Sequence, residues 1–222
     1  MVQLGRVTVD DYIACVIRTE AALQGCPPYI ALGIAMGESG FNQGALGDQA
    51  PGPTVVGADG TVYNPYRDPA TGLYYCSLGL FQLNVCGGQG VGYDPRTLLI
   101  GTVNAKIGIH PITVAVFTQT AAGYTGEALL RQVCIHSGHP GLVDPNDPRV
   151  TALVHDMYLL IFNADGSFAQ WPANNPALCA GAPPPPPPLG TWSEPFTPTT
   201  QDQAQQVIEA HFQRVSDLFA RF

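Results

Sequence analysis

The first strong pattern along the chain is a row of apolar residues at helical spacing. Between residues 10 and 25, Ile13, Val16 and Ile17 fall on one face of a helix, and Asp10 stands where a helix N-cap belongs. The pattern therefore predicts a helix over residues 10–25 that buries this face.

A second helix is predicted directly after the first. It begins at Pro28, because proline suits the first helical turn, and runs through an apolar stretch to about Glu38, where Gly40 ends it. This placement puts the Glu38 carboxyl group at the C-terminal end of a buried, apolar helix.

The stretch from about residue 42 to 76 has no long apolar pattern. Gly, Pro, Asp and Asn dominate it, and Thr61-Val62-Tyr63 is a possible short strand. A long polar loop or small hairpin in a compact domain is usually functional. Further helices are predicted over residues 78–83, 95–107, 110–121, 125–136 and 147–162.

The composition changes after residue 165. Residues 166–200 include the six consecutive prolines Pro183 to Pro188, which favour an extended polyproline II linker. Residues 201–222 are predicted to form an amphipathic docking helix that contacts a protein partner, another copy or the main domain over residues 1–165. Its hydrophobic seam consists of Ile208, Phe212, Val215, Phe219 and Phe222.

The charge of the chain excludes some classes of partner. Its formal net charge is -8 and Lys106 is its only lysine, so no basic patch is available to neutralise phosphates, and nucleic acid is not expected as a partner. No apolar stretch is long enough for a membrane span, and the N-terminal residues lack the pattern of a signal peptide.

The six cysteines form no CxxC pair and no Cys/His cluster at zinc spacing, so neither a metal site nor a cofactor is predicted. An even number of cysteines favours one to three disulfides in a protein that acts outside the cytosol. Cys76 and Cys86, which bracket one loop, are the first pair to expect. The alternative is that the cysteines are buried free thiols that behave as small hydrophobic side chains.

Two short segments carry the candidate chemistry. Residues 35–42 read AMGESGFN, and residues 77–84 read SLGLFQLN. Together they resemble the soluble lytic transglycosylase and goose-type lysozyme superfamily, whose pattern is Glu-Ser-x-Phe-Asn followed by Gly-Leu-Met-Gln. Within this superfamily, the chain resembles the type associated with phage tails and virions. Phe81 stands where the family usually has methionine. The third family motif, Tyr-Asn-Ala-Gly, would fall on residues 135–138, which keep the glycine and lack the tyrosine.

The resemblance implies a mainly α, lysozyme-like (α+β) domain that degrades peptidoglycan. The expected reaction cleaves the β-1,4 bond between MurNAc and GlcNAc in a glycan strand, with Glu38 as the acid and then the base. The chemistry independently requires a carboxyl group that stays protonated near neutral pH, and apolar surroundings favour that form. The resemblance further implies attack by the C6 hydroxyl of the substrate, which gives 1,6-anhydromuramoyl ends.

Several residues near the motifs are candidates for binding the glycan. Gly79 would admit a sugar ring close to the backbone, Gln82 offers an amide to an N-acetyl group, and Phe81 offers an apolar platform. The other candidates are Ser39, Ser77, Tyr124 and His136.

A second carboxylate would change the mechanism. Asp48, Asp59 and Asp68 are the candidates, but aspartate in a loop is most often a turn former, so the route with one acid is preferred. The expected location is a phage tail or other part of a virion, or the extracellular cell wall. The rival hypothesis is a non-catalytic structural or glycan-binding virion protein that keeps a lysozyme-like fold, and the altered third motif favours it.

Overall fold

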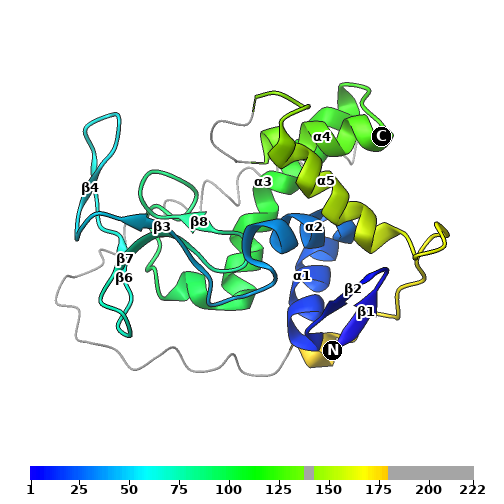
Figure 1. Cartoon of the computed structure of the whole chain (residues 1–222), viewed down its shortest axis with the longest axis horizontal. Helices are drawn as coiled ribbons and strands as arrows, with labels where there is room; N and C mark the ends of the chain where they lie inside the picture. Colours follow the sequence, from blue (N-terminus) through cyan, green and yellow to red (C-terminus); the bar gives the residue numbers. More distant parts are fainter. Residues whose placement is uncertain (138–142, 180–222) are drawn as a thin grey trace.

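A computed structural model describes residues 1–137 and 143–179 of the chain. It is an α+β structure in which the helices gather in one part and strands β3 to β8 in another (Figure 1). The predicted α+β class is confirmed. The polyproline run and the predicted docking helix over residues 201–222 lie outside the described residues.

The first two helices form as predicted. Helix α1 spans Asp11–Gln24, and the Asp10 side chain accepts hydrogen bonds from the first backbone amides of the helix. Helix α2 spans Pro28–Ser39 and ends at Gly40, which adopts a left-handed conformation with φ of 60°. Residues 30–35 are all buried, so α2 forms the centre of the core.

Helix α3 corrects two predictions. It spans Gly101–Ala121, so the helices expected over 95–107 and 110–121 are one continuous helix with Pro111 inside it. Buried isoleucines on either side of the proline hold the helix together despite the missing N–H group. The start of the first predicted helix is instead the separate 3-10 helix η1, Thr97–Leu99.

The last two helices agree closely with the predicted ranges. Helix α4 spans Gly126–His136, and helix α5 spans Pro148–Ile161. Helix α5 packs closely on α2, because Gly33 of α2 has no side chain where the backbone of Met157 of α5 approaches it. Ile34 and Glu38 of the same helix line a cavity.

The main sheet is antiparallel. Its strands are β3 (Leu46–Ala50), β6 (Tyr66–Arg67), β7 (Tyr74–Leu78) and β8 (Leu83–Asn84), with β7 between β3 and β6 and with β8 also paired to β7. The sheet brings the second motif, which runs through β7 and β8, beside the polar segment that follows α2.

Two small hairpins complete the strands. Strands β4 (Val55–Val56) and β5 (Val62–Tyr63) pair, and β5 agrees with the short strand predicted there. The pattern did not predict β1 (Val2–Leu4) and β2 (Val7–Val9), whose connecting turn donates a backbone hydrogen bond to α5.

The helix predicted over residues 78–83 is wrong, since residues 79–82 form the turn between β7 and β8, and Leu78 and Leu83 belong to these strands. Gly79 begins the turn in a left-handed conformation, with φ of 76°. The fully buried Asn104 side chain of α3 donates to the Leu78 carbonyl oxygen at 2.9 Å and accepts from the Phe81 amide at 2.8 Å. These tertiary hydrogen bonds stabilise a turn where the local sequence favours a helix.

The domain continues beyond the predicted boundary at residue 165. Residues 163–179 form a strap that runs back to the helices. The Trp171 indole donates to a carbonyl oxygen of α5 at 2.9 Å, and the Arg18 guanidinium of α1 stacks over the Trp171 ring at 5.6 Å. A disulfide joins Cys179 to Cys15 of α1. The first part of the predicted linker is therefore part of the folded domain.

Two disulfides are present in the described residues. The predicted pair, Cys76 and Cys86, is confirmed, and Cys15–Cys179 is the second bridge. Cys26 and Cys134 are buried free thiols. Because the sequence separations are 164 and 10 residues, chain entropy predicts a stabilisation of about 5 kcal/mol for Cys15–Cys179 and about 2.7 kcal/mol for Cys76–Cys86.

Candidate active site

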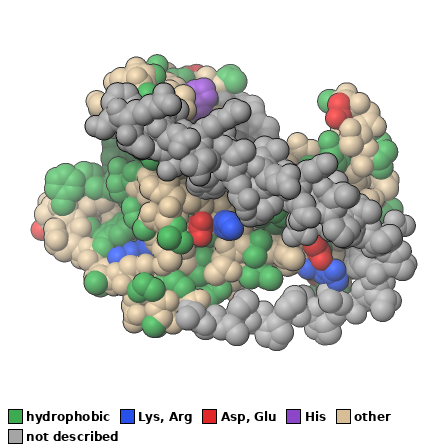
Figure 2. All heavy atoms as spheres, turned by 180° about the vertical axis from the view of Figure 1, so that it is seen from behind, with side chains coloured by type: hydrophobic (Ala, Val, Ile, Leu, Met, Phe, Trp, Pro, Cys, Tyr) green, Lys and Arg blue, Asp and Glu red, His purple; other side chains and the backbone are tan. Residues whose placement is uncertain are grey.

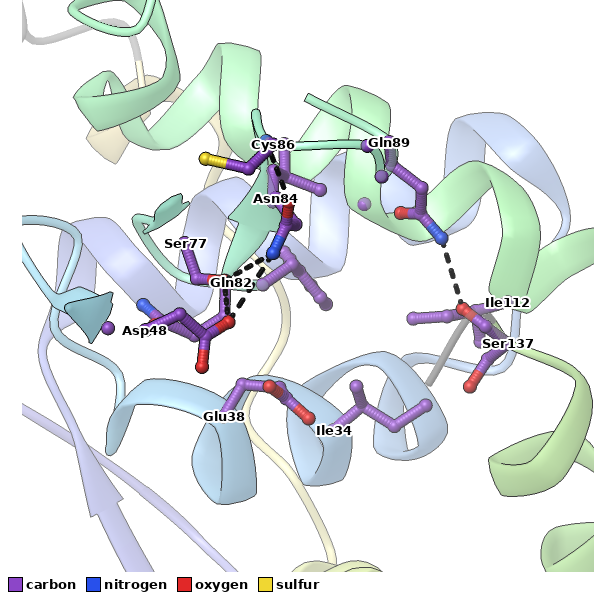
Figure 3. A pocket seen from close by; sticks show the side chains of 16 residues that line it. Ile34, Glu38, Asp48, Ser77, Gln82, Asn84, Cys86, Gln89, Ile112 and Ser137 are labelled. Carbon is purple, nitrogen blue, oxygen red and sulfur yellow. Dashed lines mark hydrogen bonds between the residues drawn. The ribbon is translucent and has the colours of Figure 1, made fainter. Parts of the chain in front are cut away.

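A cavity of about 390 Å³ lies between α2, the main sheet, α3 and the segment that follows β8. Residues from both motifs line it, Glu38 from the first and Ser77, Phe81, Gln82 and Asn84 from the second. Figure 3 shows Glu38 and Asp48 directed into the same space from the helix and from the sheet. The fold therefore joins two segments that are about 35 residues apart in the sequence.

Glu38 is half-buried on the last turn of α2, and Ile34, one turn earlier, also lines the cavity. Burial, and then the negative charge of Asp48, raise the pKa of Glu38 from 4.5 to about 7. A carboxyl group with this pKa is present in both protonation states near neutral pH. It can therefore donate a proton and take one back.

Asp48 lies in β3 and has the left-handed φ of 51°. The Ser77 hydroxyl donates to its Oδ2 atom, and the Asn84 amide donates to the same oxygen at 3.4 Å. Asn84 also contacts the Ser77 hydroxyl at 3.4 Å. Two neighbouring strands thus hold the Asp48 carboxylate in one orientation at the cavity.

The structure separates Asp48 from the two other candidate aspartates. Asp59 and Asp68 are turn formers, and hydrogen bonds from Thr61 and Thr71 lower the pKa of their carboxyl groups. Neither of them lines the cavity. Asp48 is therefore the second carboxylate of the site.

The second motif supplies one wall of the cavity. The Phe81 ring packs against Gly108 of α3, where any side chain would overlap it. The Gln82 amide donates to the Gly79 carbonyl oxygen at 2.9 Å and to the Ala45 carbonyl oxygen at 3.4 Å, so its nitrogen holds the turn, although the side chain lines the cavity.

Four predicted glycan-binding residues do not line this cavity. The Ser39 hydroxyl donates back to the helix, and Gly79 faces Asn104, which an added Cβ atom would approach to 2.3 Å. Tyr124 lies in the connection between α3 and α4, and His136 is exposed at the end of α4. Packing against Asn104 and the left-handed φ of 76° account for the glycine at position 79.

The sequence patterns did not predict one further wall of the cavity, which is the first part of the glycine-rich loop, residues 86–92. Cys86, Gly87, Gly88 and Gln89 line the cavity, and the Gln89 amide donates to the Ser137 carbonyl oxygen at 3.4 Å (Figure 3). The run of glycines that directly follows the second motif was the available signal, because glycine often marks a close approach of backbone and ligand.

Charged residues make up 12% of the chain. Seen from behind, the described part of the molecule carries only scattered acidic and basic groups (Figure 2). Within residues 1–137 and 143–179, no cluster of His, Cys, Asp or Glu is arranged to hold a metal ion. In the same part of the chain, no helix combines the length and the apolar character needed to cross a membrane.

Comparison with known proteins gave no match among protein-family models, curated proteins or solved structures.

Proposed function

We propose that the chain degrades peptidoglycan by cleaving the β-1,4 bond between MurNAc and GlcNAc, with Glu38 as the acid. The observation that carries the proposal is a glutamic acid with a pKa of about 7 in a cavity that a second carboxylate also enters. The two motifs that resemble lytic transglycosylases and goose-type lysozymes both border this cavity. A lysozyme-like fold, with the cavity between a helical part and a small sheet, belongs to the same proposal.

The proposed reaction begins with proton transfer. Protonated Glu38 donates to the glycosidic oxygen, and the departing sugar leaves positive charge on the anomeric carbon. Asp48 is the group that stabilises this charge, since Ser77 and Asn84 already hold its carboxylate in place. Glu38, now ionised, then removes a proton from the attacking hydroxyl group.

The attacking group distinguishes two routes. The family resemblance favours attack by the C6 hydroxyl of the substrate, which gives 1,6-anhydromuramoyl ends and needs one acid. The position of Asp48 favours attack by water, because hydrolysing glycosidases use two carboxylates. Hydrolysis is therefore the second candidate reaction.

Digestion of purified cell walls tests the function and the route together. We expect the turbidity of a wall suspension to fall, and mass spectrometry of the released muropeptides to identify their ends. Reducing ends indicate hydrolysis, and 1,6-anhydromuramoyl ends indicate transglycosylation. Intact walls that retain bound protein would instead favour the rival hypothesis of a non-catalytic glycan-binding protein.

The alkaline limb of the pH profile is a separate prediction. Activity should fall with a midpoint near pH 7 as Glu38 loses its proton, in a plot of kcat/KM against pH. Because the charge of Asp48 raises the pKa of Glu38, Asp48→Asn should move this limb to lower pH. The same limb in both proteins would mean that the charge of Asp48 does not raise the pKa of the titrating acid.

Delivery to the wall is part of the proposal. The described residues that line the cavity all lie between 34 and 137. The strap ends at Cys179, which is bonded to Cys15 of α1. We propose that residues 201–222 bind a protein partner and carry the domain in a phage tail or virion, or at the cell wall.

A further inference from the structure

We propose that the Cys76–Cys86 disulfide fixes the glycine-rich loop as a wall of the cavity, so that catalysis requires this cysteine pair in its oxidised form. The inference rests on the proposed function, and it concerns how the same site is assembled. It assigns a positioning role to the disulfide and no contact with the reacting atoms.

The disulfide joins two parts of the site. Cys76 lies in β7 directly before Ser77, whose hydroxyl donates to Asp48. Cys86 lines the cavity at the start of the loop, two residues after Asn84, which also donates to Asp48. The bond therefore connects the strand that orients the second carboxylate to the loop that forms the neighbouring wall.

The composition of the loop favours conformational freedom. Four of its seven residues are glycine, and glycine loses more conformational freedom on folding than any other residue. Its backbone bonds reach only the end of β8, since Gly88 and Gly90 both donate to the Asn84 carbonyl oxygen, at 3.2 and 2.9 Å, and the Cys86 amide donates to the Asn84 side chain at 2.7 Å. The Gln89 contact with Ser137, at 3.4 Å, is long for a hydrogen bond. The disulfide is thus the covalent connection between this loop and β7, the strand that carries Ser77.

The Cys76–Cys86 bond would form from the reduced pair by thiol–disulfide exchange. A thiolate of the reduced pair attacks a small-molecule disulfide such as oxidised glutathione and displaces one thiol. The second cysteine then attacks the mixed disulfide, displaces the other thiol and closes the Cys76–Cys86 bond. The pair loses two electrons and two protons, and one glutathione disulfide becomes two thiols. A reducing compartment would hold the cavity incomplete, and an oxidising one would complete it.

The other cysteines provide the control. Cys15–Cys179 ties the strap to α1, and neither cysteine lines the cavity. Burial raises the pKa of both Cys26 and Cys134 to about 12, which leaves little reactive thiolate on either. A change of activity with redox state that survives in Cys15→Ser/Cys179→Ser therefore reports on Cys76–Cys86.

The test compares two double variants of the full chain by wall digestion, thermal unfolding and hydrogen exchange. Cys76→Ser/Cys86→Ser should lower kcat/KM at least tenfold and raise the exchange of amides 86–92. Cys15→Ser/Cys179→Ser should keep the wild-type rate and the protection of amides 86–92. Its Tm should fall about twice as far as that of Cys76→Ser/Cys86→Ser, because the Cys15–Cys179 bond closes a much longer segment of the chain. In that second variant, dithiothreitol should remove activity and oxidised glutathione should restore it.

Equal rates and equal loop exchange in Cys76→Ser/Cys86→Ser and the wild type would overturn the inference. If that variant fails to fold, the wild type reduced and alkylated under native conditions replaces it, with the same two expected results. If the oxidised wild type leaves walls intact, the proposed function fails, and hydrogen exchange alone decides whether the disulfide orders the loop.

Discussion

Glu38→Gln is expected to reduce cell-wall digestion by about 10²- to 10⁴-fold, the usual contribution of general acid–base catalysis. The amide has nearly the shape of the carboxylic acid but has no proton to deliver to the glycosidic oxygen. The rate of turbidity loss at pH 6 measures the effect. Glu20→Gln on α1 is the matched control and should keep the wild-type rate.

The same substitution should stabilise the fold at neutral and alkaline pH. A carboxyl group whose pKa is raised from 4.5 to about 7 in the folded state costs stability as the pH rises through that interval. At about 1.36 kcal/mol per pH unit, the cost reaches at most roughly 3 kcal/mol, and glutamine does not incur it. The Tm of Glu38→Gln should therefore exceed that of the wild type at pH 8.

The rate of the same variant decides whether Glu38 is the acid. If Glu38→Gln keeps more than about a tenth of the wild-type rate of wall digestion, the acid is another residue.

Asp48→Asn is expected to lower the rate of hydrolysis by about 10²- to 10³-fold, the loss typical when one stabilising group is removed from a transition state. Asparagine can keep an oxygen near Ser77 but brings no negative charge to the developing cation. Muropeptide analysis should show a reduced yield of reducing ends. Any remaining turnover should produce a larger share of 1,6-anhydromuramoyl ends.

Two other aspartates of the same polar segment serve as controls for this result. Asp59→Asn and Asp68→Asn remove the same charge from turns that do not line the cavity. Each variant should keep a rate within about twofold of the wild type, which corresponds to the ±0.5 kcal/mol typical of a surface substitution. If Asp48→Asn behaves as these controls do, Asp48 is structural and the route with a single acid is correct.

Local signals explain which parts of the fold could be predicted. Helix α1 has an N-cap and an apolar face, and α2 has proline at its start and glycine at its end, so the sequence alone places both within a residue or two. The position of Glu38 at the end of a buried helix follows from the same signals.

Tertiary contacts explain the parts that could not be predicted. Asp48 reaches the cavity because β3 pairs with β7, and no local pattern around an aspartate in a Gly-rich segment encodes that register. The segment 78–83 forms a turn because distant hydrogen bonds outweigh its helical pattern. The hairpin of β1 and β2 is too short, at three residues a strand, for alternation to identify it.

The buried amide of Asn104 has a consequence for protein engineering. It belongs to neither motif, yet its side chain holds the turn from which Phe81 and Gln82 reach the cavity. A designer who copies only residues 35–42 and 77–84 onto another scaffold would leave that turn without its support. The transferable unit is discontinuous, and it includes a residue on α3 whose side chain is fully buried, away from any saccharide.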